Sequence, residues 1–189
     1  MLIQIRICLF SKSLFKLQHN SKKMYATIND FLTDWNYESQ STLDLFKNLT
    51  DDSLNKVIHE DVRTLGFLYW HIVHTLQEMP DKMGLSVDIK QQTDYANETV
   101  AEIIETYESG AKLLADAIKK NWSDADLIKE DNMYGEPWKR AVSLSILIKH
   151  QAHHRAEMVV LMRILGLPVI GAYGPTREDW AKYGLASMK

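Results

Sequence analysis

Two histidines in the last third of the chain have a spacing that suits metal binding. His150 and His154 are four residues apart, and on a helix this spacing puts both rings on one face, with Cβ atoms about 5–6 Å apart. Two imidazole nitrogens can then meet one cation at about 2.0–2.1 Å each. Gln151 stands where the helical zinc-protease motif has its catalytic glutamate, which argues against such a protease. The spacing alone is not decisive, because surface helices also produce such pairs by chance.

The apolar residues around this pair indicate that it points inward. The stripe of His150 and His154 also carries Leu147, Met158, Leu161 and Leu165. A second apolar stripe, earlier in the chain, carries His71. Buried imidazoles are costly unless they are hydrogen-bonded or bound to something, and helix-bundle cores are common places for metal sites. Three histidines without a fourth protein ligand would leave an open position for water or substrate.

The other histidines fit the site less well. His74 is the alternative to His71, but an edge or surface position is the simpler interpretation. His153 lies about 100° around the helix from His154, so we do not expect it to face the same ion. His59 precedes the second helix in a polar stretch, where we expect exposure to solvent.

Two charged residues and several aromatic residues are further candidates. Glu157, three residues after His154, can orient a ligand histidine, act as a general base, or form a partly exposed salt bridge. Arg155 suits a structural fork to a carboxylate, either across the bundle or at a dimer interface. The aromatic residues that can line a pocket, or simply pack in the core, are Trp35, Tyr69, Trp70 and Trp138.

The helical period recurs four times and predicts an all-α four-helix bundle. The expected helices span about 27–48, 64–79, 94–120 and 139–165. Thr27 or Asn29 is expected to cap the first helix and Asp94 the third, and the second is expected to end before Pro80.

The segments outside these helices carry turn signals. Residues 132–138 contain Gly135 and Pro137 and are expected to form a loop with a little extended structure. A short C-terminal helix is expected from Thr176, where Thr-x-x-Asp resembles a capping box. The bundle is therefore followed by a short C-terminal extension.

The charge of the chain is unevenly distributed. Of the 189 residues, the first 23 carry five basic groups and no acid, whereas residues 24–189 carry 17 bases and 25 acids, a net −8. We expect residues 1–23 to be a basic leader or a disordered extension, with the native start at Met24, and residues 24–189 to form one cytoplasmic domain. The acidic body argues against nucleic-acid binding, and no apolar run reaches the roughly 18 residues of a membrane span.

Cysteine usage limits the chemistry further. The only cysteine, Cys8, lies in the basic segment, so neither an intrachain disulfide nor a paired-cysteine metal site is possible. Any metal must be held by histidine, with or without carboxylate. Any thiol in a reaction of residues 24–189 must arrive as a substrate.

Two segments resemble the DinB/YfiT-like family. SLSILIKHQAHHRAEMVVLMRILGLPVIGAYGPTREDW is similar to the last core helix of that family, which carries H-x3-H-R-G-Q, and TLGFLYWHIVHTLQEM is similar to the helix with its first metal ligand. The resemblance covers residues 24–180 and implies His71, His150 and His154 as metal ligands. Ala156 and Glu157 replace the usual Gly and Gln, so the resemblance does not carry the family's role of that Gln over to Glu157.

The resemblance implies a four-helix bundle, commonly a homodimer, with a divalent metal such as zinc or nickel. Some members of the family transfer low-molecular-weight thiols to electrophiles, so a thiol transferase acting on small molecules, with Glu157 moving a proton or orienting a ligand, is the leading expectation. Metal-dependent hydrolysis is the alternative. A non-catalytic metal-binding or stress-response protein is the third, and a fourth ligand from His74, Glu78 or Glu157 would favour it.

Overall fold

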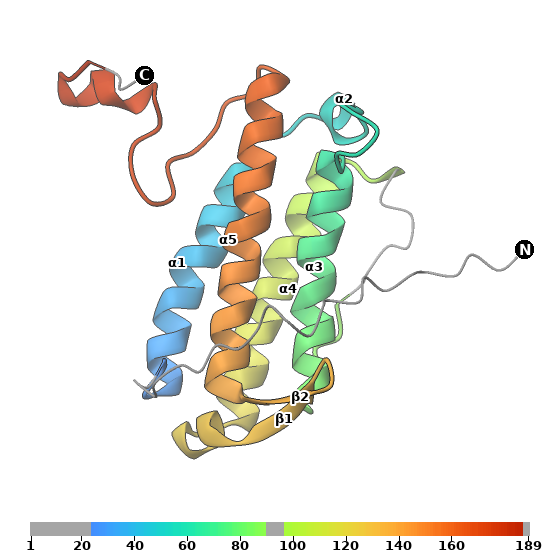
Figure 1. The fold of residues 1–189 in the computed structure, drawn as a ribbon, viewed down its shortest axis with the longest axis vertical. Coiled ribbons are helices and arrows are strands. Elements are labelled where there is room, and N and C mark those ends of the chain that lie inside the picture. The colour runs from blue at the N-terminus through green and yellow to red at the C-terminus, as the bar shows by residue number, and fades with distance from the viewer. Residues whose placement is uncertain (1–23, 90–96, 187–189) are drawn as a thin grey trace, which may run out of the picture.

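The computed structural model describes residues 24–89 and 97–186, and four long helices run side by side in it (Figure 1). They are α1 (Ile28–Phe46), α3 (Leu65–Lys82), α4 (Val100–Asn121) and α5 (Arg140–Ile164). Helices α1 and α3 each pack against both α4 and α5. The expected all-α four-helix bundle is therefore confirmed, and α3 and α5, which carry the candidate histidines, are direct neighbours.

Shorter elements connect and follow the long helices. They are α2 (Asp51–Leu54), the 3₁₀ helices η2 (Asp124–Ile128) and η3 (Asp179–Tyr183), and the strands β1 (Glu130–Met133) and β2 (Glu136–Lys139). Thr176 and Asp179 form the expected reciprocal pair, because the Thr176 N–H donates to the Asp179 carboxylate and the Asp179 N–H donates to Thr176 Oγ1. The short helix itself begins at Asp179 rather than at Thr176. The segment after α5 leads away from the bundle to η3 (Figure 1).

Capping motifs define where α1 and α4 begin. Thr27 caps α1 and forms a reciprocal capping box with Asp30. Helix α4 begins at Val100 rather than at residue 94, because Thr99 and Glu102 form a second capping box there. The expected cap Asp94 lies outside the described residues. A Thr-x-x-Glu pair satisfies two backbone donors at once and is a stronger start signal than a lone acid.

The expected end of the second helix before Pro80 is wrong, because α3 continues to Lys82. Proline removes one helical hydrogen bond and its ring crowds the carbonyl four residues earlier, but only Asp81 and Lys82 follow Pro80 in α3, and the end of the helix is well capped. Gly84, with φ 70°, provides that cap. Its N–H donates to the carbonyl of Asp81 and the Leu85 N–H donates to that of Pro80, the pattern of a Schellman motif.

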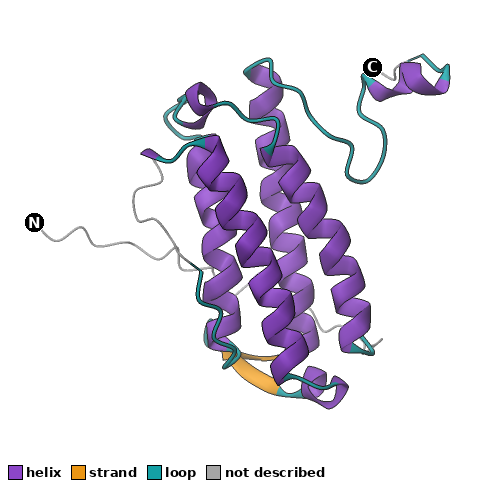
Figure 2. Cartoon of the chain, turned by 180° about the vertical axis from the view of Figure 1, so that it is seen from behind, coloured by secondary structure: helices purple, strands orange, loops and turns teal. Residues whose placement is uncertain are grey.

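Residues 130–139 form an antiparallel hairpin rather than the expected loop. β1 and β2 pair from Glu130 with Lys139 to Met133 with Glu136. The two-residue turn has positive φ at both Tyr134 and Gly135, which is typical of a type I′ turn. The strands are short and mostly exposed, so they lack the apolar alternation that would have predicted them. The hairpin lies across one end of the bundle (Figure 2).

The four aromatic pocket candidates separate into core and periphery. Trp35 and Tyr69 are only 2% and 1% exposed and belong to the core. The indole N–H of Trp35 donates to the carbonyl of Ala111 at 3.0 Å, which ties α1 to α4. Trp138 is half-buried in β2, and Trp70 is half-buried on α3, beside the candidate histidines. No helix among the described residues is long and apolar enough to cross a bilayer.

Candidate metal centre

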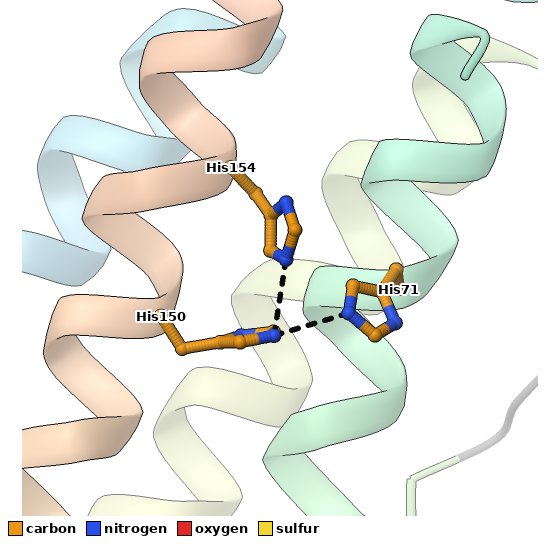
Figure 3. Close-up of side chains that lie close together, drawn as sticks. All are labelled: His71, His150 and His154. Atoms are coloured by element: carbon orange, nitrogen blue, oxygen red, sulfur yellow. Dashed lines mark hydrogen bonds between the residues drawn. The ribbon is translucent and has the colours of Figure 1, made fainter. Parts of the chain in front are cut away.

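Three histidine side chains from two helices converge between α3 and α5 (Figure 3). His71 belongs to α3, and His150 and His154 belong to successive turns of α5. His150 Nε2 lies 3.0 Å from His71 Nε2 and 3.1 Å from His154 Nε2. We call these three residues the histidine cluster. The fold thus brings together the three histidines that the sequence singles out.

The spacing of the three nitrogens suits one shared cation. Nitrogens bound to a tetrahedral zinc ion at about 2.0–2.1 Å lie about 3.3 Å from one another, close to the 3.0 and 3.1 Å separations observed. Hydrogen bonds alone serve the cluster poorly, because one hydrogen on His150 Nε2 can point at only one of its two neighbours. The three side chains are therefore placed so that they can hold a metal ion.

Glu157 sets the orientation of one histidine in the cluster. Its Oε2 lies 2.6 Å from His154 Nδ1. A carboxylate can only accept a hydrogen bond, so His154 Nδ1 carries the hydrogen and donates it. The neutral ring then has a lone pair on Nε2, which faces the other two histidines. A carboxylate behind a histidine in this way is typical of metal ligands.

His150 has no such support. Its Nδ1 atom is buried and lacks a hydrogen-bond partner in the described part of the chain. The two histidines of α5 therefore differ at Nδ1, which donates to a carboxylate in His154 and has no such acceptor among the described residues in His150.

Burial keeps the cluster uncharged. Loss of hydration is the main cause that lowers the pKa of His71 to about 4 and that of His150 to about 3. Loss of hydration also lowers the pKa of His154, although the hydrogen bond that His154 donates to Glu157 opposes it. Near pH 7 the three imidazoles are thus in the neutral form that binds metals.

A cation and an aromatic ring form a column beside the cluster. The guanidinium carbon of Arg63 lies 4.9 Å from the centre of the Phe67 ring. That ring stacks on the imidazole of His71, with 6.0 Å between centroids and 20° between planes. Arg63 is absent from the predicted site, although its four-residue steps to Phe67 and then to His71 are visible in the sequence.

The other histidines lie outside the cluster, as expected. His74 stacks on Trp70, with 5.2 Å between ring centroids, and does not join the group of ligand atoms. The His153 side chain is 66% exposed, and its Nε2 lies 3.6 Å from the Glu157 carboxylate. His59 is exposed.

Arg155 makes a fork to a carboxylate across the bundle, one of the two arrangements expected for it. Its Nη2 donates to Glu38 Oε2 at 2.6 Å, and its Nη1 donates to the Glu38 carbonyl at 3.0 Å. The Tyr173 hydroxyl, from the C-terminal segment, lies 2.7 and 2.8 Å from the two carboxylate oxygens of Glu38. The two charged side chains are only 4% and 9% exposed. The pair thus joins α5, α1 and the C-terminal segment.

A separate cavity lies between α1 and the C-terminal segment. It has a volume of about 480 Å³, and its lining includes Tyr37, Tyr173 and Asp179. None of the histidine cluster lines it. The cavity therefore lies apart from the side chains that can bind a metal. We place the candidate site at the histidine cluster.

Comparison with known proteins agrees with this fold. The chain is 36% identical over 167 residues to YrdA of Bacillus subtilis (strain 168), a protein described as uncharacterized, and the match covers 88% of this chain and 99% of that protein. It is also similar to the crystal structure of a DinB-like protein from Bacillus cereus ATCC 10987, with a TM-score of 0.74, 36% identity, and coverage of 79% of this chain and 99% of the other. The model of the DinB family matches residues 24–187. The chain therefore belongs to the DinB family.

Proposed function

We propose that the protein is a metal-dependent enzyme that holds one divalent cation, zinc or nickel, through His71, His150 and His154. The observation that carries this proposal is the convergence of three neutral Nε2 atoms at 3.0 and 3.1 Å. Such a donor set suits a borderline cation better than magnesium or calcium, which take oxygen ligands.

The donor set favours an open site rather than a closed structural one. A structural zinc site normally has four protein ligands, whereas the group that contains His71 and His150 has three members, all histidines. Glu78, one candidate for a fourth ligand, accepts a hydrogen bond from the Tyr134 hydroxyl at 2.7 Å. Glu157, another, is engaged with Nδ1 of His154 and not with Nε2. An open position supports the catalytic proposals over the purely metal-storing one.

The proposed reaction is the transfer of a low-molecular-weight thiol to an electrophilic small molecule. Residues 24–189 contain no cysteine, so a sulfur nucleophile must come from outside that part of the chain, and we propose that it is a substrate. A bound divalent cation would favour the ionised form of a thiol, or of water if the reaction is hydrolysis. Glu157 would hold His154 in its ligating tautomer. With a side chain that is 44% exposed, the carboxylate would also be able to pass a proton to solvent.

Metal content tests the first half of this proposal. The protein is purified without a histidine tag and its bound metal is measured by elemental analysis, alongside His154→Ala and the matched control His153→Ala. We expect about one equivalent in the wild type and in His153→Ala, and a large loss in His154→Ala. A wild type that lacks metal and takes up neither zinc, nickel nor manganese would contradict the proposal.

Turnover tests the second half. We expect metal-dependent consumption of a model electrophile in the presence of a small thiol, and loss of that rate in His154→Ala. Hydrolysis of an activated ester without any thiol would instead favour the hydrolase. If no thiol of a broad panel gives a rate above that of the metal-free protein, the transfer reaction is wrong.

A further inference from the structure

We propose that Arg63 is a specificity-determining residue that binds a carboxylate, or a similar anionic group, of the molecule that reaches the histidine cluster. The inference rests on the proposed metal centre and adds the charge of its substrate. It is carried by the position of Arg63 in the column beside His71 and by its lack of an acidic partner.

The column fixes where the guanidinium lies. Arg63 sits one residue before Thr64, the N-cap of α3, so its backbone is held by the start of a well-ordered helix. Its guanidinium lies over the face of Phe67, and Phe67 in turn stacks on His71. The guanidinium is therefore separated from His71, a member of the histidine cluster, by the single aromatic ring of Phe67.

Arg63 carries a charge that the described residues do not neutralise. Within residues 24–89 and 97–186, no carboxylate lies within ion-pair distance of it, and its guanidinium lies over the Phe67 ring. By contrast, Arg140, Arg155, Arg163 and Arg177 each pair with an acid. A guanidinium that is exposed and unpaired in an acidic protein retains all five donors for a ligand.

The sum of the formal charges around the cluster would favour the binding of an anion. Three neutral histidines with a divalent cation would contribute +2, Arg63 contributes +1, and Glu157, bonded to His154, contributes −1. A positive site within a body of net −8 would concentrate small anions locally while the remaining surface repels them. The planar guanidinium also matches a carboxylate with two parallel hydrogen bonds.

A purely structural role explains the position of Arg63 less well. An exposed cation–π contact stabilises a fold only weakly, and Phe67 already packs between His71 and Trp70. Arg63 is also exposed to solvent. We therefore assign the Arg63 guanidinium to ligand binding.

Two thiols of similar size but different charge test the inference. The protein is loaded with cobalt, whose visible spectrum reports ligands that reach the ion, and is titrated with 3-mercaptopropionate and with 2-mercaptoethanol. The same titrations are done with Arg63→Gln, Arg63→Lys and the control Arg177→Gln. Arg177 is also exposed, but it belongs to the C-terminal segment and pairs with Glu178 at 3.2 Å. Cobalt affinity and circular dichroism show whether each variant keeps its site and fold.

We expect Arg63→Gln to weaken 3-mercaptopropionate binding about 5-fold, as for a partly exposed charge pair, and to leave 2-mercaptoethanol unchanged. Arg63→Lys should keep part of the preference, and Arg177→Gln all of it. Because affinities are compared between variants, the different basicities of the two thiols cancel.

Two results would overturn the inference and leave the metal centre intact. One is a preference that Arg63→Gln does not change, and the other is an equal loss of affinity for both thiols. Failure of the wild type to bind cobalt, or a cobalt spectrum that neither thiol alters, would overturn the proposed function and this inference together.

Discussion

A hydrogen bond of 2.6 Å between His154 Nδ1 and Glu157 gives the two ring nitrogens of this imidazole different roles. Nδ1 is the donor, so Nε2 is left with the lone pair that a cation needs. The sequence places Glu in a position where the family has Gln. Either side chain can accept from Nδ1–H, but only the carboxylate adds a negative charge, which raises the basicity of the ligating nitrogen.

Glu157→Gln and Glu157→Ala separate these two contributions. We expect Glu157→Ala to weaken metal binding about 10- to 100-fold, because it removes the acceptor that holds the tautomer. Glu157→Gln should weaken it less, since the amide oxygen still accepts. Competition with a coloured chelator gives the affinities. If the alanine variant binds as tightly as the wild type, Glu157 is only an exposed partner of the kind that the sequence also allowed.

The buried pair of Arg155 and Glu38 has a different role, because neither side chain belongs to the histidine cluster. We expect Glu38→Gln to lower the free energy of unfolding by about 3 kcal/mol, since it leaves a buried guanidinium without its counter-charge. Tyr173→Phe, which removes only a hydroxyl from the same group, should cost about 1 kcal/mol. Urea denaturation measures both changes. Equal small effects would mean that water enters the site and solvates Arg155.

The sequence predicts some of these residue roles but not others, for a physical reason. His150 and His154 share one helix, so their juxtaposition follows from the period of 3.6 residues. His71 requires only that its helix face theirs. Glu38 lies 117 residues from Arg155 in sequence, and no local pattern connects them. Arg63 lies before its helix begins, where periodic apolar residues give no guidance.

A buried acid, Glu98, lies two residues before the start of α4. Glu98 is 7% exposed, and its Oε2 has no hydrogen-bond partner in the described part of the chain. Burial raises the pKa of this carboxyl above its usual range, and the charge of Glu102 adds to the effect. The fold therefore prefers the protonated form, and the carboxylate at neutral pH destabilises it.

We therefore expect Glu98→Gln to stabilise the protein at pH 7. For a group whose pKa is raised by folding, the stabilisation of the native state is complete below the unfolded pKa, about 4.5, and is lost as the pH rises through the folded value. The advantage of Gln should accordingly shrink as the pH falls from 7 towards 4.5. Urea unfolding at several pH values measures this. Glu108→Gln, at an exposed position of the same helix, should show a smaller dependence.

The bounds of the elements are predictable where caps are strong and apolar periods are long. Thr27 and Thr176 illustrate this, since each cap motif in the sequence forms in the structure. Pro80 illustrates the opposite, because a strong Schellman motif at Gly84 overrides the signal of a proline one turn earlier. The hairpin around Gly135 depends on backbone pairing between exposed residues, which leaves no trace in the apolar pattern.

At the scale of the whole molecule, the four helical periods are enough to predict a bundle but not which helices are adjacent. Adjacency decides whether a site exists, because the histidine cluster needs α3 beside α5. The cluster also joins two helices that are separated by α4 and the hairpin in sequence. A cation bound there would hold these distant segments together.

Metal loading should therefore stabilise the entire fold and not only the site. A ligand that binds the native state at about 100 times its dissociation constant adds about 2.7 kcal/mol. For a domain of 150–250 residues this corresponds to a rise in Tm of roughly 5–10 °C. Differential scanning calorimetry with and without zinc or nickel measures the shift. His153→Ala should keep the shift, because that side chain lies outside the cluster. His154→Ala should lose it, because two nitrogens remain where three are required, and an equal shift in both variants would place the stabilising ion elsewhere on the molecule.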